Sequence, residues 1–284
     1  MKKDQLIKWI SNVIKTKIMK RENQCIYELE AKIGKFKGQN FNSNKYLESI
    51  KGMEQLDKSK AKYQFESKIN INQYNNAYDY LKQKENQVLI KRLDFSLNKQ
   101  QRNSFQIIND QISAILIEKQ KNLQEHIDII NDKIQFRISL NQEKTLSRSL
   151  KDIIAQMPSR KQHANFIRLK QTLFVKENNL EFALSKVASI FKYDPEFQKI
   201  IDEITSSKCS NIQIKLEQIF KDQNLTDYEF EIEIAQIENF NDEQIENLSR
   251  ELLNQVDFFW SIFNFKQVED EQKAEKKVKP NENE

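Results

Sequence analysis

The segment Tyr228–Ile234 reads YEFEIEI, alternating glutamate with apolar residues without interruption. Because successive side chains of a β-strand point to opposite faces, this pattern predicts a strand with three glutamates on one face. Glutamate is a poor strand former, so strand propensity does not explain the choice. Neighbouring carboxylates on one face lie about 6.6 Å apart and repel by about 2.5 kcal/mol at an effective dielectric constant of about 20. Either water screens this face, or positive charge lies in front of it.

A second segment, residues 27–33, reads YELEAKI and has a similar alternation. Glu28, Glu30 and Lys32 share one face of this predicted strand, opposite four apolar residues. If the apolar faces of both strands pack under helices, the five glutamates point into a barrel interior, where they require cations. Carboxylate oxygens suit Mg²⁺ or Mn²⁺ better than Zn²⁺, which favours histidine and cysteine. Taken alone, each segment is better explained by a solvated sheet face, but the two together favour a metal site.

Segments between these two carry cations in the same alternating manner. The predicted polar rows are Arg102, Ser104 and Gln106 in RNSFQII; Arg137, Ser139, Asn141 and Glu143 in QFRISLNQE; and Arg168, Lys170 and Thr172 in FIRLKQT. An interior with carboxylates on one side and arginine and lysine on the other could hold a metal–polyphosphate complex. The metal would neutralise phosphate oxygens, and the basic side chains would bind the remaining charge.

The periodicity predicts an α+β fold, a closed antiparallel eight-stranded β-barrel with flanking helices. Strands are predicted at 26–36, 62–69, 88–97, 102–108, 112–119, 135–141, 166–176, 180–187 and 228–234, and helices at 4–20, 71–86, 147–156 and 242–265. One domain, residues 1–265, would contain all of them, with a helical insert at about 190–225. The charged segment 266–284 has almost nothing to bury and is predicted to be disordered.

Composition excludes several other classes of protein. With 46 basic and 42 acidic residues, the net charge is only +4, so any anion site must be local. Three glycines and the absence of GxxxxGK[ST] and GxGxxG exclude glycine-rich phosphate loops. The two cysteines form no metal-ligand pattern and predict reduced thiols in an intracellular protein. No apolar run is long enough to cross a membrane, so no membrane partner is expected.

The motifs ExExK at Glu28–Lys32 and ExExE at Glu229–Glu233 resemble the signature of the triphosphate tunnel metalloenzymes. The chain is most similar to the metal-dependent RNA 5′-triphosphatases of mRNA capping in fungi and protozoa. YELEAKIGKF, FRISLNQE, FIRLK and YEFEIEI follow one another in the order of that family, and the resemblance spans about Lys3 to Phe265. It implies that the barrel encloses a triphosphate tunnel.

The resemblance also implies roles for individual residues. Glu28, Glu30 and Glu233 would bind the divalent metal, Mg²⁺ or Mn²⁺. Asp94 would match an acidic position that braces a basic residue. Seven further residues would bind phosphates, support the metal or orient the attacking water: Lys32, Arg102, Glu143, Arg168, Lys170, Glu229 and Glu231. The chain departs from the family pattern at Thr172, where a base is usual, and at Ala183, where an acid is usual.

The implied activity is hydrolysis of the γ-phosphate at the 5′-triphosphate end of nascent mRNA, the first step of cap formation, in the nucleus. The resemblance implies a separate RNA guanylyltransferase and the transcription machinery as partners, and the chain itself has no KxDG motif. A homodimer is an alternative that the sequence leaves open. Two other functions also stay open: a tunnel phosphohydrolase of inorganic triphosphate or nucleoside triphosphates, and a non-catalytic scaffold on the same fold.

Overall fold

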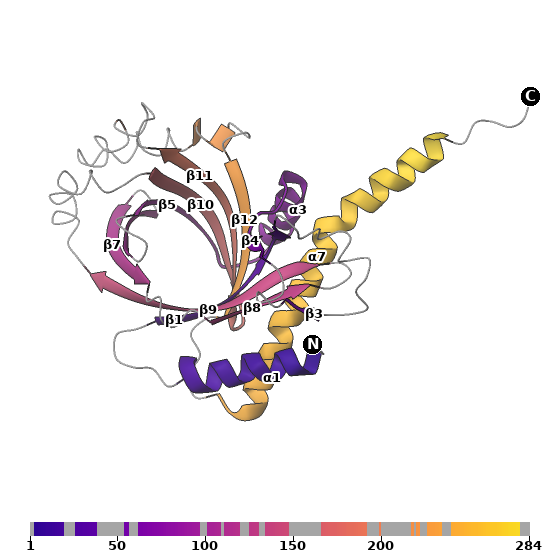
Figure 1. Ribbon diagram of the computed structural model, residues 1–284. Helices are drawn as coiled ribbons and strands as arrows, with labels where there is room; N and C mark the ends of the chain where they lie inside the picture. The colour runs from indigo at the N-terminus through magenta and orange to yellow at the C-terminus, as the bar shows by residue number, and fades with distance from the viewer. Residues whose placement is uncertain are drawn as a thin grey trace, which may run out of the picture.

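The computed structural model contains a strongly curved sheet with helices packed on its outer side (Figure 1). The residues described are 3–19, 26–38, 54–56, 62–96, 101–108, 111–119, 125–130, 134–147, 166–191, 199, 217–218, 220–221, 226–234 and 240–278. Among its helices are α1 (Lys3–Val13), the π-helix η1 (Ile14–Ile18), α3 (Ile71–Leu81) and α7 (Asp242–Val278). Within the described part of the chain, no helix is both long and apolar enough to cross a membrane.

The strands form one large antiparallel sheet and a small second one. Their bounds are β1 (Ile26–Ile33), β2 (Lys35–Lys37), β3 (Glu54–Gln55), β4 (Gln64–Glu66), β5 (Gln87–Ser96), β6 (Gln101–Ile108), β7 (Gln111–Lys119), β8 (Glu125–Ile130), β9 (Gln135–Ser147), β10 (Phe166–Glu177), β11 (Leu180–Phe191) and β12 (Thr226–Ile234). The large sheet has the order β1-β12-β11-β10-β5-β6-β7-β9-β8-β3, and β2 pairs with β4. The predicted mixture of helices with a large antiparallel sheet is therefore confirmed.

The order of the large sheet returns to its first strand. Besides β12, β1 pairs with β9, from Ile26 opposite Glu143 to Ile33 opposite Phe136. Pairing can thus be followed from β1 through β12, β11, β10, β5, β6, β7 and β9 back to β1. Beyond this circuit, β8 adds to the other edge of β9 over Gln135–Leu140, and β3 adds to β8.

One face of β1 and β12 packs into the main hydrophobic core. Leu29 and Ala31 on β1, and Phe230 and Ile232 on β12, are completely buried there. Phe259 of α7 packs against this surface, with its ring centroid 4.4 Å from that of Phe230. Since side chains alternate along a strand, the glutamates of both strands lie on the opposite face. The core therefore determines which way the acidic rows point.

Helices α1, α3 and α7 cover this core from outside. On α1, Leu6, Ile7 and Ile10 are buried at helical spacing, as the pattern predicts. Figure 1 shows α1 crossing α7, and the hydroxyls of Ser11 and Ser249 lie 2.9 Å apart at this crossing. At the start of α7, the side chains and backbone amides of Asn241 and Gln244 bond reciprocally, so α7 begins with a capping box.

Several predicted boundaries differ from the observed ones. The strand predicted at 26–36 is interrupted at Gly34, where a Cβ atom would lie 2.2 Å from the carbonyl oxygen of Glu66. The helix predicted at 71–86 ends at Leu81, and the backbone turns at Asn86, which has a φ of 58°. A turn joins the strands predicted at 166–176 and 180–187, with Asn178 at a φ of 55°. Glycine and asparagine are the residues that tolerate these conformations best.

The C-terminal helix is longer than predicted. We expected the helix to end at 265 and a disordered segment to follow, whereas α7 continues to Val278 and projects away from the sheet (Figure 1). The sequence from Lys266 to Val278 is rich in lysine and glutamate, which favour helix even without burial. The helix predicted at 147–156 and most of the insert at about 190–225 lie outside the described residues, although Ser147 ends β9.

Candidate active site

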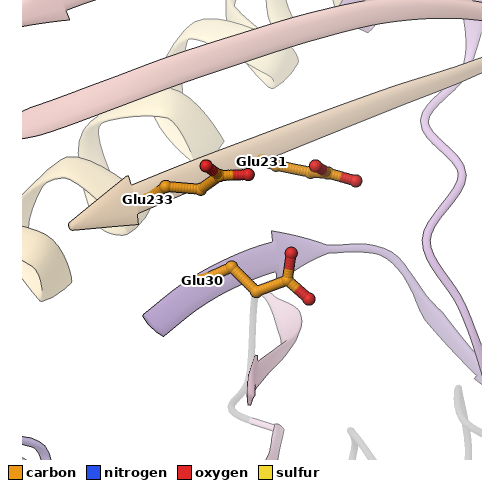
Figure 2. A group of neighbouring side chains, drawn as sticks. All are labelled: Glu30, Glu231 and Glu233. Carbon is orange, nitrogen blue, oxygen red and sulfur yellow. The ribbon is translucent and has the colours of Figure 1, made fainter. Parts of the chain in front are cut away.

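Three carboxylates converge between β1 and β12. Glu30 on β1 and Glu231 and Glu233 on β12 each offer one oxygen, and these three oxygens lie within 4.8 Å of one another (Figure 2). We call these residues the acidic cluster. Glu30 and Glu231 are almost completely buried, and Glu233 is partly exposed.

Strand register brings the cluster together. Glu30 is directly opposite Glu233, and Lys32 is directly opposite Glu231, in the antiparallel pair formed by β1 and β12. Residues directly opposite each other have Cβ atoms about 5 Å apart, so the two acidic rows meet. A register shift by one residue would turn the carboxylates of one strand into the core. The apolar residues that alternate with them therefore stabilise this register.

The acidic cluster carries more negative charge than its surroundings compensate. The pKa of Glu233 is raised to about 8, mainly by burial and to a smaller extent by repulsion from Glu231, Glu28 and Glu30. This carboxyl group consequently binds a proton at neutral pH when no cation is present. A divalent cation placed between the three oxygens would remove the cause of the repulsion.

Lys32 compensates part of this charge from within β1. Its Nζ atom lies 3.0 Å from Oε1 of Glu30 and 3.2 Å from Oε1 of Glu231. Burial opposes the charged form of this lysine, but Glu231 and Glu30 raise its pKa above the ordinary value. Burial also opposes ionisation of Glu231, yet the charges of Lys170 and Lys32 hold its pKa below the ordinary value.

Two further cations extend from β10 to the glutamates of β12. Both Glu229 oxygens accept hydrogen bonds from Nη2 of Arg168, at 2.6 and 2.7 Å. The Nζ atom of Lys170 lies 3.8 Å from Glu229 and 3.7 Å from Glu231. Lys170 is buried, so these charges meet in a medium that screens them less than water does. The structure thus brings together five predicted site residues: Lys32, Arg168, Lys170, Glu229 and Glu231.

The donor atoms of the acidic cluster fit a small divalent cation. Oxygens bound to one Mg²⁺ at about 2.1 Å lie at most about 4.2 Å apart. The observed limit of 4.8 Å is therefore within reach of small side-chain rotations. An all-oxygen set suits Mg²⁺ or Mn²⁺, and the raised pKa of Glu233 marks a local excess of negative charge.

Comparison with known proteins gives similarity in structure but not in sequence. No family model and no curated protein matches the chain. The RNA triphosphatase Pct1 of S. pombe is similar with a TM-score of 0.50 and 14% identity, over 96% of this chain and 90% of that chain. Its complex with the Spt5 CTD gives the same score and identity, over 96% and 92%. The RNA triphosphatase domain of a trifunctional mimivirus mRNA capping enzyme gives 0.44 and 11%, over 92% and 96%.

The chain has the fold of an RNA triphosphatase. The resemblance inferred from ExExK and ExExE is thereby confirmed at the level of the fold, which is what a likeness at 14% identity supports. In this fold the two acidic motifs occupy adjacent strands, although about 200 residues separate them in the sequence.

Three other predicted site residues lie outside the acidic cluster. Glu28 is on the same face of β1 and is partly exposed, and its charge contributes to raising the pKa of Glu233. It does not belong to the three carboxylates within 4.8 Å of one another. Arg102 is on β6 and Glu143 is on β9, opposite Lys119. The side chains of Arg102 and Glu143 lie outside the described residues.

Asn141 is a site residue to which the sequence analysis assigned no role. Its Nδ2 atom donates a hydrogen bond of 2.6 Å to Oε1 of Glu30, and both side chains are buried. This bond orients the Glu30 carboxylate from the β9 side. The alternation of QFRISLNQE places Asn141 on the same face as Glu143, which is the signal that could have indicated it.

The two departures from the family pattern also lie beside the acidic rows. Ala183 on β11 is directly opposite Glu231, and Ser185 is directly opposite Glu229. The Thr172 hydroxyl is 2.9 Å from that of Ser185, and both residues are buried. The two hydroxyls satisfy each other, so this part of the wall is neutral. The cations that face the glutamates of β12 come instead from Arg168, Lys170 and Lys32.

Proposed function

We propose that this chain is a divalent-metal-dependent RNA 5′-triphosphatase that removes the γ-phosphate of nascent mRNA in the first step of cap formation. The observation that carries the proposal is the acidic cluster, which faces Lys32 and Lys170 in a buried setting. A carboxylate set for a metal beside lysine and arginine is the arrangement that phosphoryl transfer requires.

We propose further that the circuit of eight paired strands is a closed barrel whose interior is the triphosphate tunnel. The support is the pairing of β1 with both β12 and β9, which joins the two ends of the strand order. The polar rows of β1, β10 and β12 contact one another across this interior, as the ion pair between Arg168 and Glu229 illustrates. Such an interior would surround the phosphates and exclude most water.

The metal would be Mg²⁺ or Mn²⁺. Glu30 and Glu233 are positioned to bind it. The third carboxylate would be Glu231 according to the distances between the oxygens, or Glu28 according to the family resemblance. The bound ion would supply Lewis acidity at the phosphoryl oxygens. Asn141 would keep the Glu30 carboxylate in its orientation through its hydrogen bond.

In the proposed reaction, a water oxygen attacks the γ-phosphorus in line with the bond to the β–γ bridging oxygen. The new phosphorus–oxygen bond forms as that bond breaks, which releases orthophosphate and leaves a 5′-diphosphate end. Lys170 and Arg168 would donate hydrogen bonds to the phosphate oxygens. These bonds would replace some of the contacts that the two side chains make with Glu229. A carboxylate of the acidic rows would orient the water and accept its proton, a role that family resemblance also gives to Glu143.

The test is release of γ-labelled phosphate from RNA with a 5′-triphosphate end, with and without Mg²⁺ or Mn²⁺. Glu30→Gln removes one charge while keeping the side-chain shape, and it should reduce release by about a hundredfold or more. Glu246→Gln is the matched control, because Glu246 lies on the exposed side of α7 in an ion pair with Arg250. Full activity without metal, or equal activity of the two variants, would contradict the proposal.

A non-catalytic scaffold is the second candidate, favoured by the neutral wall at Thr172, Ser185 and Ala183. It predicts no metal-dependent phosphate release from any triphosphate. A tunnel phosphohydrolase of small triphosphates would instead prefer tripolyphosphate or nucleoside triphosphates to RNA ends. Comparison of kcat/KM for these substrates separates the three functions.

The proposed partners follow from the proposed step. The 5′-diphosphate product would pass to a separate RNA guanylyltransferase, and the site of action would be the nucleus. Contact with the transcription machinery is supported by the solved complex of S. pombe Pct1 with the Spt5 CTD. Co-precipitation of the full-length chain with a guanylyltransferase from the same cells tests this expectation, and its absence under several salt conditions would contradict it.

A further inference from the structure

Arg92 on β5 lies in the same interior as the cations already described. It is directly opposite Lys170 in the pair formed by β5 and β10, and cross-strand partners share one face of a sheet. Its side chain is 19% exposed, so it is largely enclosed. No role was assigned to Arg92 by family resemblance or by the proposed function.

The ion pair between Arg92 and Asp94 leaves polar atoms unused. The Nε atom of Arg92 lies 3.1 Å from Oδ1 of Asp94 but makes no hydrogen bond, and Oδ2 of Asp94 is buried without a partner. Oδ1 of Asp94 accepts a hydrogen bond from the Ser104 hydroxyl instead. The pair is therefore held by charge, while the donors of the guanidinium are incompletely engaged.

A different arginine of the same protein shows what a structural ion pair looks like. Arg137 donates two parallel hydrogen bonds to Asp128, at 2.5 Å from Nε and 3.0 Å from Nη2. This two-bond geometry is the favoured one for arginine with a carboxylate. Arg92 lacks this two-bond geometry although Asp94 is on the same strand, so Asp94 does not satisfy the guanidinium of Arg92 as Asp128 satisfies that of Arg137.

The charge of Arg92 also acts on Lys170. Arg92 and Lys170 are cross-strand partners, and Arg168 is two residues from Lys170 on the same face of β10, so three cations gather there. Two cations this close repel each other, and an anion between them would relieve the repulsion. The neighbouring wall at Thr172 and Ser185 provides no charge that could do so.

We propose that Arg92 binds substrate phosphate, forming with Lys170 a two-cation clamp for the oxygens of the triphosphate, and that Asp94 positions its guanidinium. This inference rests on the proposed function for the identity of the substrate, and it adds a binding residue on β5. The ligand it requires is a compact polyanion, because the two cations come from adjacent strands.

Binding of inorganic tripolyphosphate, measured by isothermal titration calorimetry in EDTA and again with Mg²⁺, tests the clamp. Arg92→Gln should weaken binding about ten- to a hundredfold, the loss expected for a hydrogen bond to a charged group. Lys91→Gln is the matched control, because Lys91 is the adjacent cation on the opposite face and pairs with Glu217. It should change the affinity less than about twofold.

Two more variants keep the test decisive if Arg92→Gln folds poorly. Arg92→Lys retains the charge without the planar fork and should give intermediate affinity. Asp94→Asn should weaken binding in the wild-type background but not in the Arg92→Gln background, a non-additivity that a purely structural role of Asp94 would not produce. Circular dichroism of each variant verifies the fold.

The outcomes separate this inference from the proposed function. Equal tripolyphosphate affinity of wild type and Arg92→Gln, or no binding by wild type in either condition, would overturn the clamp. Selective weakening by Arg92→Gln together with no metal-dependent phosphate release would support the clamp while refuting the enzyme activity.

Discussion

Binding of Mg²⁺ to the acidic cluster should release a proton from Glu233. The carboxyl group is protonated at neutral pH because burial and the charges of Glu231, Glu28 and Glu30 raise its pKa to about 8. A carboxylate must lose its proton to bind a metal, so metal binding and deprotonation are linked. The perturbation is therefore addition of the ion to the metal-free protein, with pH as the variable.

The magnitude follows from the pKa. With a pKa of about 8, about 0.9 of the Glu233 side chains are protonated at pH 7 and about 0.1 at pH 9. The protein should therefore release about 0.9 proton per ion bound at pH 7, and about 0.1 at pH 9. Apparent metal affinity should rise by almost tenfold from pH 6 to pH 7 and become nearly constant above about pH 9.

Isothermal titration calorimetry in buffers of different ionisation enthalpy measures the number of protons released. Glu233→Gln should bind Mg²⁺ without releasing a proton, whereas Glu246→Gln, altered on the exposed side of α7, should behave as wild type. Proton release near zero at pH 7, or unchanged release from Glu233→Gln, would refute the assignment of the raised pKa to this residue.

Two further predictions concern the ligand set and the core. If Glu231 is the third carboxylate, Glu231→Gln should weaken Mn²⁺ binding at least about tenfold, and Glu28→Gln should weaken it only about two- to threefold. Calorimetry measures both affinities, and the reverse order would support Glu28 as the third ligand. Phe259→Ala should lower the free energy of unfolding by about 3–5 kcal/mol in urea titrations, because this ring is completely buried. Phe258→Ala, at a residue 39% exposed, should cost about 1 kcal/mol or less, and equal losses would contradict the proposed packing.

The acidic strands were predictable because their alternation is uninterrupted. In YEFEIEI and YELEAKI the apolar residues are all required by the core, so the opposite face and its glutamates followed directly. The position of Arg168 and Lys170 on the polar face of β10 followed from the same periodicity, whereas their contacts with Glu229 depend on the order of the strands. Period two is a local property of each strand, and a local property can be inferred without knowing which strands pair.

The composition of the acidic cluster was harder to predict from the sequence, because it depends on the register between strands that are far apart in the chain. Nothing local to YELEAKI indicates that Glu30 is opposite Glu233, or that Asn141 approaches Glu30 from β9. The same limit applied to Arg92, because its position next to the site is evident only from its pairing with Lys170. The strand β8, with the sequence EHIDII, was missed because it is short and adds outside the circuit of eight strands.

The adjacency of β1 and β12 has a consequence for biosynthesis. Glu30 leaves the ribosome about 200 residues before Glu231 and Glu233, so the acidic cluster cannot assemble on a nascent chain until β12 has been made. Contacts of such long sequence separation form late and slow folding. Until then β1 exposes an unpaired edge and an unmatched row of carboxylates, and ribosome-bound chains that end before Thr226 should bind no divalent ion at this site. Synthesis of the last strand therefore completes the pairing of β1 and the acidic cluster in the same event.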